Sequence, residues 1–100
     1  MNTDTRTYDL PCYDTRKSFY GKARVIETTG PYKTRTLQSY NTNVCTIDDH
    51  GKLTKLSPVA TPTTRRHIRS FLRHCGYAEI KNADWDALPL HFGIMLEDIA

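Results

Sequence analysis

Long apolar segments are missing from this 100-residue sequence, so we expect neither a membrane-spanning nor a secreted protein. There is no run of 18 apolar residues, the usual minimum for a membrane-spanning helix. Residues 1–6 are polar and lack the apolar stretch of a secretory signal, so we expect a cytoplasmic protein. Phe, Ile, Leu and Val together number 20, enough for one hydrophobic core but not for two. We therefore expect residues 1–100 to form a single domain in which residues 1–8 are poorly ordered.

Cysteine and the signatures of common catalytic and metal sites are also scarce. Cys12, Cys45 and Cys75 are odd in number and widely spaced, which indicates reduced thiols that act as small apolar residues. His67 and His74 lie seven residues apart beside Cys75, and a metal there needs a further ligand from elsewhere. No Gly-rich phosphate loop and no G-x-S-x-G motif is present. We expect no enzyme, no metal and no cofactor.

The charge is unevenly distributed. Residues 16–73 contain twelve Lys or Arg against three acidic residues, whereas residues 82–100 contain four acidic residues and no Lys or Arg. Residues 1–15 are also acidic, with three Asp against one Arg. The net charge of +3 is therefore the sum of a basic central region and two acidic end segments. Such asymmetry is typical of a protein with an anionic partner, most often nucleic acid. The alternative is internal neutralisation, in which the acidic C-terminal segment folds onto the basic body.

Alternation of apolar and polar side chains predicts three or four antiparallel strands between residues 17 and 57. The segments expected to be extended are 17–27, 32–37, 44–47 and 52–56. The 14 threonines support this prediction, because β-branched residues favour strands over long helices.

Two local irregularities are expected within this sheet. Leu37 and Tyr40 are three residues apart, which breaks the two-residue period and predicts either a bulge near Gln38 and Ser39 or a strand break at Asn41. Between the last two strands, a four-residue hairpin loop ends at Gly51, for which we expect the left-handed conformation.

One amphipathic helix is predicted from Pro62 to Cys75. Thr61 is a suitable N-cap, proline suits the first helical position, and Gly76 is a typical C-terminal stop. The apolar stripe expected to face the sheet consists of Thr64, Ile68, Phe71, Leu72 and Cys75. The opposite face carries only cations, which we expect to be exposed: Arg65, Arg66, Arg69 and Arg73.

The C-terminal segment is too apolar to remain in water. Asn82 is expected to cap a short helix that ends before Pro89, and helical spacing of apolar residues continues through residues 88–99. The segment 88–99 either docks on its own domain or joins two chains in a homodimer. The predicted fold is α+β, with an antiparallel sheet of three to four strands packed against one main helix and a short helical C-terminal segment.

Two groups of residues are candidates for binding. At the helix N-terminus, backbone N–H groups, threonine hydroxyls and guanidinium groups predict a site for phosphate or an acidic partner. Its residues are Thr63, Thr64, Arg65, Arg66, Arg69 and Arg73. On the sheet, aromatic residues that alternate with cations predict base stacking. These are Tyr20, Lys22, Arg24, Lys33, Arg35 and Tyr40. The alternative is a capped helix with solvated arginines, beside aromatic residues that belong to the core.

Four segments resemble, in matching order, small uncharacterised proteins of phages, prophages and mobile elements of gut bacteria. These segments are 17–23 (KSFYGKA), 37–44 (LQSYNTNV), 63–72 (TTRRHIRSFL) and 85–89 (WDALP). The resemblance brings no assigned activity with it. It implies a phage or mobile-element product in the cytoplasm of a bacterial host. Proteins of this origin are often inhibitors of host defence, including anti-CRISPR proteins, or accessory nucleic-acid binders.

These observations give two expectations about function. The first is a small non-enzymatic, anti-defence binding protein of a phage or mobile element. It would bind a host defence protein, a nucleic-acid complex or a nucleotide signal through the basic helix face. The alternative is an accessory or regulatory protein that binds DNA or RNA directly. Salt-dependent binding to random nucleic acid favours the alternative.

Overall fold

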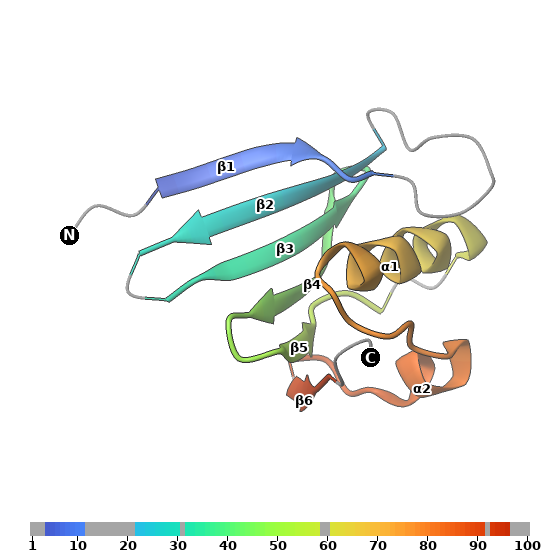
Figure 1. The fold of residues 1–100 in the computed structure, drawn as a ribbon. Helices are drawn as coiled ribbons and strands as arrows, with labels where there is room; N and C mark the ends of the chain where they lie inside the picture. Colours follow the sequence, from blue (N-terminus) through green and yellow to red (C-terminus); the bar gives the residue numbers. More distant parts are fainter. Residues whose placement is uncertain (1–3, 12–21, 31, 59–60, 92, 97–100) are drawn as a thin grey trace.

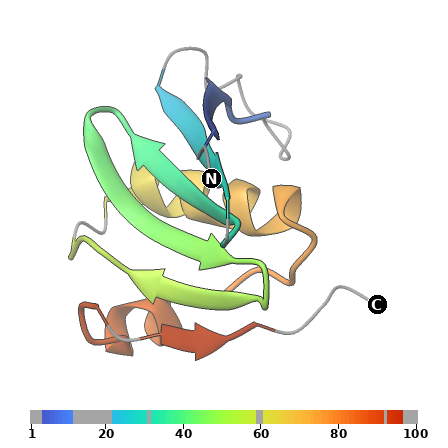
Figure 2. The same cartoon turned by 90° about the vertical axis from the view of Figure 1, so that its left-hand side faces the viewer.

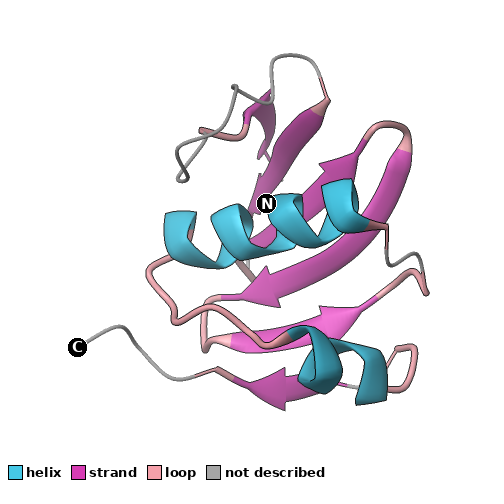
Figure 3. Ribbon diagram, turned by 90° about the vertical axis from the view of Figure 1, so that its right-hand side faces the viewer, coloured by secondary structure: helices cyan, strands magenta, loops and turns pink. Residues whose placement is uncertain are grey.

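The computed structural model describes residues 4–11, 22–30, 32–58, 61–91 and 93–96 and has an α+β fold (Figure 1). Its six antiparallel strands form one sheet in chain order: β1 (Asp4–Asp9), β2 (Ala23–Thr29), β3 (Thr34–Ser39), β4 (Thr42–Asp48), β5 (Lys52–Lys55) and β6 (Gly93–Met95). The helices are α1 (Pro62–His74) and α2 (Asn82–Ala87). Both lie on one face of the sheet (Figure 3), and α1 is behind the strands in the opposite view (Figure 2).

The predicted fold class is confirmed, and two further strands extend the sheet. Residues 4–8, expected to be poorly ordered, belong to β1 and pair with β2. Within the segment 88–99, expected to be helical, residues 93–95 form β6 instead. They pair with β5, and this pairing overrides a helical pattern that Gly93 already weakens. The predicted short helix is present as α2, but the expectation that Asn82 caps it was wrong: Asn82 is its first residue, and Lys81 is the N-cap without a side-chain hydrogen bond.

The two faces of the sheet differ in composition. Toward the helices, the strands bury apolar side chains: Ala23, Val25, Leu37, Cys45, Ile47 and Leu53. On the other face, the register places one residue from each of five strands in a row: Thr7, Ile26, Thr36, Thr46 and Thr54. Because β-branched side chains pack well across a pleated surface, this row explains how a threonine-rich sequence forms a sheet.

Both predicted irregularities are confirmed. The register of β3 and β4 shifts between Leu37 and Gln38, which is the predicted bulge. In the β4–β5 loop, Gly51 has a φ of 85°, in the left-handed region.

Gly51→Ala is expected to lower the free energy of unfolding by about 1–2 kcal/mol. Alanine must adopt a positive φ there, and its Cβ would lie 3.0 Å from the Tyr77 hydroxyl oxygen. Gly76→Ala is the control, because Gly76 also has a positive φ and has open space around the added Cβ. Urea denaturation of both variants measures the difference. A loss no larger in Gly51→Ala than in Gly76→Ala would show that contact with Tyr77 adds nothing.

Helix α1 begins and ends as predicted. The side chain of Thr61 accepts a hydrogen bond from the backbone N–H of Thr64 at 3.1 Å, and Pro62 is the first helical residue. Gly76 has a φ of 90° just beyond the last turn. The buried face of the helix consists of Thr64, His67, Ile68, Ser70, Phe71 and Leu72. Neither α1 nor α2 is long and apolar enough to cross a membrane, as judged from the described residues.

A buried lysine anchors α2 to the sheet. Lys55 Nζ donates hydrogen bonds to the carbonyl oxygens of Trp85 at 3.0 Å and Leu88 at 3.2 Å. It also lies 5.0 Å from the centroid of the Trp85 ring, a cation–π contact. The charge thereby satisfies carbonyl groups at the C-terminus of a short helix.

The described part of the segment 88–99 docks on its own sheet. The backbone N–H of His91 donates to the carbonyl oxygen of Lys55 at 2.7 Å, and that of Leu96 donates to Gly51 at 2.9 Å. Ile94 packs against the core. This is the docking alternative, and a homodimer through this segment stays a prediction.

Candidate functional site

The residues predicted at the helix N-terminus do not form one exposed face. Thr63 is exposed, but Thr64 is buried, and its hydroxyl accepts a hydrogen bond from the Thr61 hydroxyl at 3.0 Å. The reason is its place on the apolar stripe, four residues before Ile68. Thr64 therefore takes part in the helix cap, and its burial agrees with its predicted place on the apolar stripe.

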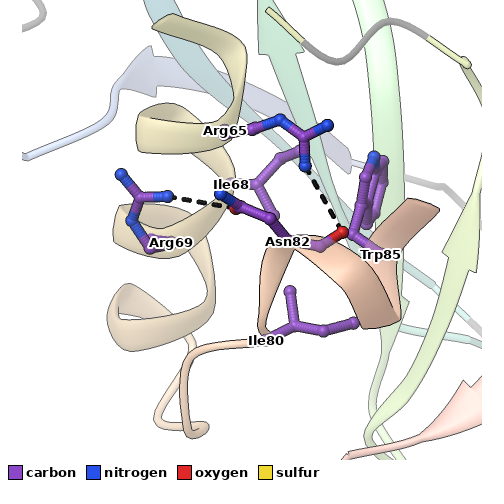
Figure 4. Close-up of a pocket in the computed structure, with 6 residues that line it drawn as sticks. All are labelled: Arg65, Ile68, Arg69, Ile80, Asn82 and Trp85. Atoms are coloured by element: carbon purple, nitrogen blue, oxygen red, sulfur yellow. Dashed lines mark hydrogen bonds between the residues drawn. The ribbon is translucent and has the colours of Figure 1, made fainter. Parts of the chain in front are cut away.

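Arg65 is engaged by α2. Its Nη2 atom lies 2.8 and 2.9 Å from the two carboxylate oxygens of Asp86, and its Nη1 donates to the carbonyl oxygen of Asn82 at 3.3 Å (Figure 4). The Arg65 side chain is only 18% exposed, so the expectation of a solvated residue was wrong. Asp86 belongs to the acidic C-terminal segment, and internal neutralisation therefore occurs at this position.

The Glu79 carboxylate forms ion pairs with two further arginines of α1, Arg69 and Arg73. It lies 3.7 Å from Arg69 Nε and 3.4 Å from Arg73 Nη1. Arg69 also donates to the side-chain oxygen of Asn82 at 3.4 Å (Figure 4). Arg66 is partly buried. The predicted basic face is therefore only partly exposed, and acidic residues neutralise part of its charge.

The space between α1 and α2 is filled by side chains. Figure 4 shows the six residues around it: Arg65, Ile68, Arg69, Ile80, Asn82 and Trp85. It has no room for a water molecule. The Trp85 side chain is buried there, and its Nε1 has no hydrogen-bond partner among the residues that the structure describes. This region is a packed helix–helix contact and not a ligand cavity.

The residues predicted on the sheet do not form one surface. Arg24 lies between the buried Ala23 and Val25, so it faces away from the helices, and it forms an ion pair with Asp9 at 3.9 Å. Arg35 shares the face of Leu37 instead. The expectation of a single stacking surface was wrong, because alternation along the strands separates these cations. Lys33 is exposed, and Tyr20 lies outside the described residues.

Two of the predicted residues meet at the N-terminal end of α1. The backbone N–H of Tyr40 donates to the carbonyl oxygen of Lys22 at 2.7 Å, and Tyr40 has a φ of 56°. Its side chain is 52% exposed. The Tyr40 ring centroid lies 6.0 Å from that of His67, which belongs to α1. The β3–β4 turn and the start of α1 therefore form one continuous surface.

A pocket of about 180 Å³ opens between this turn and α1. Most of its lining residues carry hydroxyl groups: Ser39, Tyr40, Thr42, Val44, Thr61 and Thr64. We refer to it as the hydroxyl pocket. A cavity with several groups that both donate and accept hydrogen bonds suits a small polar or anionic group.

A buried serine–histidine pair supports the wall of the hydroxyl pocket. Ser39 Oγ and His67 Nδ1 lie 2.7 Å apart and share a hydrogen bond. Burial, together with the positive charges of Arg66 and Lys22, lowers the pKa of His67 to about 4. His67 is therefore neutral at pH 7, while two cations add positive potential near the pocket.

Most of the residues that line the hydroxyl pocket were not among the predicted site residues. His67 had a usable signal: it lies three residues after Thr64 and four before Phe71, so it belongs to the buried stripe of the helix. Ser39 and Thr61 had none, because only the tertiary fold brings the end of β3 to the start of α1.

A second polar cluster lies at the other end of α1. Tyr8 Oη donates to Glu27 Oε2 at 3.0 Å and shares a hydrogen bond of 2.8 Å with His74 Nε2. Burial, together with the hydrogen bond to Glu27, raises the pKa of Tyr8 to about 12. His74 and His67 thus contact different partners. Among the described residues, no group of three or more His, Cys, Asp or Glu is placed to hold a metal ion.

The cysteines are not activated. Cys45 is fully buried and Cys75 is partly buried, and both are free thiols. Burial raises the pKa of both thiols, that of Cys75 to about 11. A raised pKa keeps both thiols mainly protonated at neutral pH, and the thiolate is the more reactive form. Cys12 lies outside the described residues.

Comparison with known proteins gives a family but no activity. No curated protein and no solved structure matches the chain. One family model matches residues 9–87, a segment that contains the hydroxyl pocket, all of α1 and all of α2. The chain therefore belongs to a family of unknown function, DUF8033.

Proposed function

We propose that the chain is a non-enzymatic binding protein for a phosphate-bearing ligand, a free nucleotide or a nucleic-acid strand, at the hydroxyl pocket. The observation that carries the proposal is the exposed ring of Tyr40 beside this pocket. The site lies at the N-terminal end of α1.

The pocket supplies groups that suit a phosphate. Thr42 lines it, and its hydroxyl group can donate to a phosphate oxygen. The start of α1 adds the positive end of the helix dipole. Arg66 and Lys22 are close enough to act on His67 electrostatically, so their charges also attract an anion. Because His67 is neutral, it does not repel the positive charges of Arg66 and Lys22 beside the pocket wall.

Tyr40 suits the base of a nucleotide. Its ring is accessible, and the hydrogen bond to Lys22 fixes its backbone. Base–aromatic stacking contributes about 1–3 kcal/mol per base and tolerates any base, because every base has a π face. A pocket of about 180 Å³ admits a phosphate group, which leaves the base outside on the tyrosine.

The biological setting within this proposal comes from the sequence resemblance. It supports a phage or mobile-element product with an anti-defence role in the bacterial cytoplasm, for which the ligand is a nucleotide signal. A host defence protein or nucleic-acid complex as partner remains a prediction. The alternative, an accessory protein that binds DNA or RNA directly, uses the same phosphate and base chemistry.

Tyr40→Ala is expected to weaken ligand binding about ten-fold or more through the loss of stacking. Tyr32→Ala is the matched control, because Tyr32 is 76% exposed and lies in the β2–β3 connection, at the other end of β3. Fluorescence anisotropy with a labelled single strand of about ten nucleotides measures binding. Competition by adenosine monophosphate separates the two sources of phosphate. Equal affinities of the two variants, or no binding of either probe to the unchanged protein, would overturn the proposal.

A further inference from the structure

The three arginines Arg65, Arg69 and Arg73 form a row along α1. They are spaced by four residues, so successive members lie about 6 Å apart along the helix axis. We refer to them as the arginine row. Since residues 62–75 contain no Asp or Glu, the described carboxylates that neutralise the row come from outside the helix.

The segment 79–86 places acceptor oxygens along this row. The Asp86 carboxylate is bidentate on Arg65, and Glu79 lies between Arg69 and Arg73. Between them, the backbone carbonyl oxygen of Asn82 accepts a hydrogen bond from Arg65, and its side-chain oxygen accepts one from Arg69 (Figure 4). Two carboxylates and the oxygens of Asn82 thus face the arginine row.

The contacts of Glu79 with Arg69 and Arg73 are of the kind that a stronger anion displaces. Among the described residues, the three positive charges of the row face two negative charges, those of Glu79 and Asp86. The side chains of Arg69, Arg73 and Glu79 are between 38% and 50% exposed, and ion pairs in such settings contribute little to stability. Arginine also binds phosphate in a bidentate manner.

Other contacts hold the segment in place. Trp85 is buried, and Lys55 donates to the carbonyl oxygens of Trp85 and Leu88. Replacement of Glu79 and Asp86 by their amides therefore leaves α2 docked and changes only the charge in front of the row.

We propose that the arginine row is a binding surface for the phosphates of a nucleic-acid backbone, and that Glu79 and Asp86 are intramolecular competitors that weaken this binding. The surface is distinct from the hydroxyl pocket, because none of its arginines lines that pocket. The inference therefore does not rest on the proposed function.

The test compares full-length variants by anisotropy with a labelled single-stranded DNA of about 20 nucleotides at about 50 and 200 mM salt. We expect Glu79→Gln combined with Asp86→Asn to raise the affinity about ten-fold and to steepen its salt dependence. Asp84→Asn is the control, because Asp84 is an exposed acid of the same helix that forms no ion pair among the described residues. We expect it to change the affinity less than about two-fold.

Two further variants locate the gain. Arg69→Gln added to the double variant should abolish it, whereas Tyr40→Ala added to the double variant should leave it intact. Thermal melting of each variant verifies that α2 and the core remain folded. The proposal is overturned if the double variant gains no affinity, if Asp84→Asn gains as much affinity as the double variant, or if Tyr40→Ala removes the gain.

Discussion

Trp85→Ala is expected to lower the free energy of unfolding by about 3–5 kcal/mol. Trp85 is the largest of the fully buried side chains, at 1% exposure, and its ring packs against Lys55 Nζ. Truncation leaves a cavity between α2 and the sheet and removes the aromatic ring that contacts the buried Lys55 ammonium group. Because a domain of this size has about 5–15 kcal/mol of stability in total, the loss is a large fraction of it. Urea denaturation should show a lower midpoint at an unchanged slope.

Trp85→Phe is the companion variant and should lose much less, about 1–2 kcal/mol. The indole Nε1 has no hydrogen-bond partner among the described residues, so its removal leaves no described acceptor unpaired. The aromatic surface that packs against the core is mostly kept. A loss as large as that of Trp85→Ala would contradict this account of the site.

The protein is expected to lose about 2–3 kcal/mol of stability as the pH falls from 6.5 to about 4, through protonation of His67. In the folded protein, burial and the charges of Arg66 and Lys22 lower the pKa of His67 to about 4. The unfolded chain therefore binds more protons than the folded one across this interval, and the stability falls with the pH. Urea denaturation at a series of pH values measures the slope.

His67→Gln should flatten this slope. Glutamine keeps a polar partner for Ser39 but does not titrate, so the variant is less stable at neutral pH and less sensitive to acid. His50→Gln is the control, because His50 is exposed in the β4–β5 loop. A slope that is the same in His67→Gln and in the unchanged protein would assign the acid sensitivity to another group, such as His74, whose pKa burial also lowers.

Features set by a few neighbouring residues could be predicted from the sequence. The Thr61 cap, the stop at Gly76, the left-handed Gly51 and the bulge after Leu37 each follow from local steric or hydrogen-bonding rules. The buried stripe of α1 follows in the same way from its period.

Features set by distant pairing could not be predicted. The strand character of residues 93–95 depends on the free edge of β5, about 40 residues earlier in the chain. The partly covered arginines depend on where α2 docks, and the sequence showed only that Glu79 and Asp86 were available. The hydroxyl pocket exists only because the bulged hairpin of β3 and β4 reaches the start of α1.

The strand order of the sheet bears on how the chain folds. Strands β1 to β5 each pair with the next strand in sequence, and short connections join β2, β3, β4 and β5, so this part forms from successive hairpins. Such local topology favours rapid folding for a domain rich in strands. The pairing of β5 with β6 is different, because the whole of both helices lies between them in the chain. During synthesis, strands β1 to β5 can therefore pair before β6 has left the ribosome. Pairing of β6 with β5 then completes the sheet.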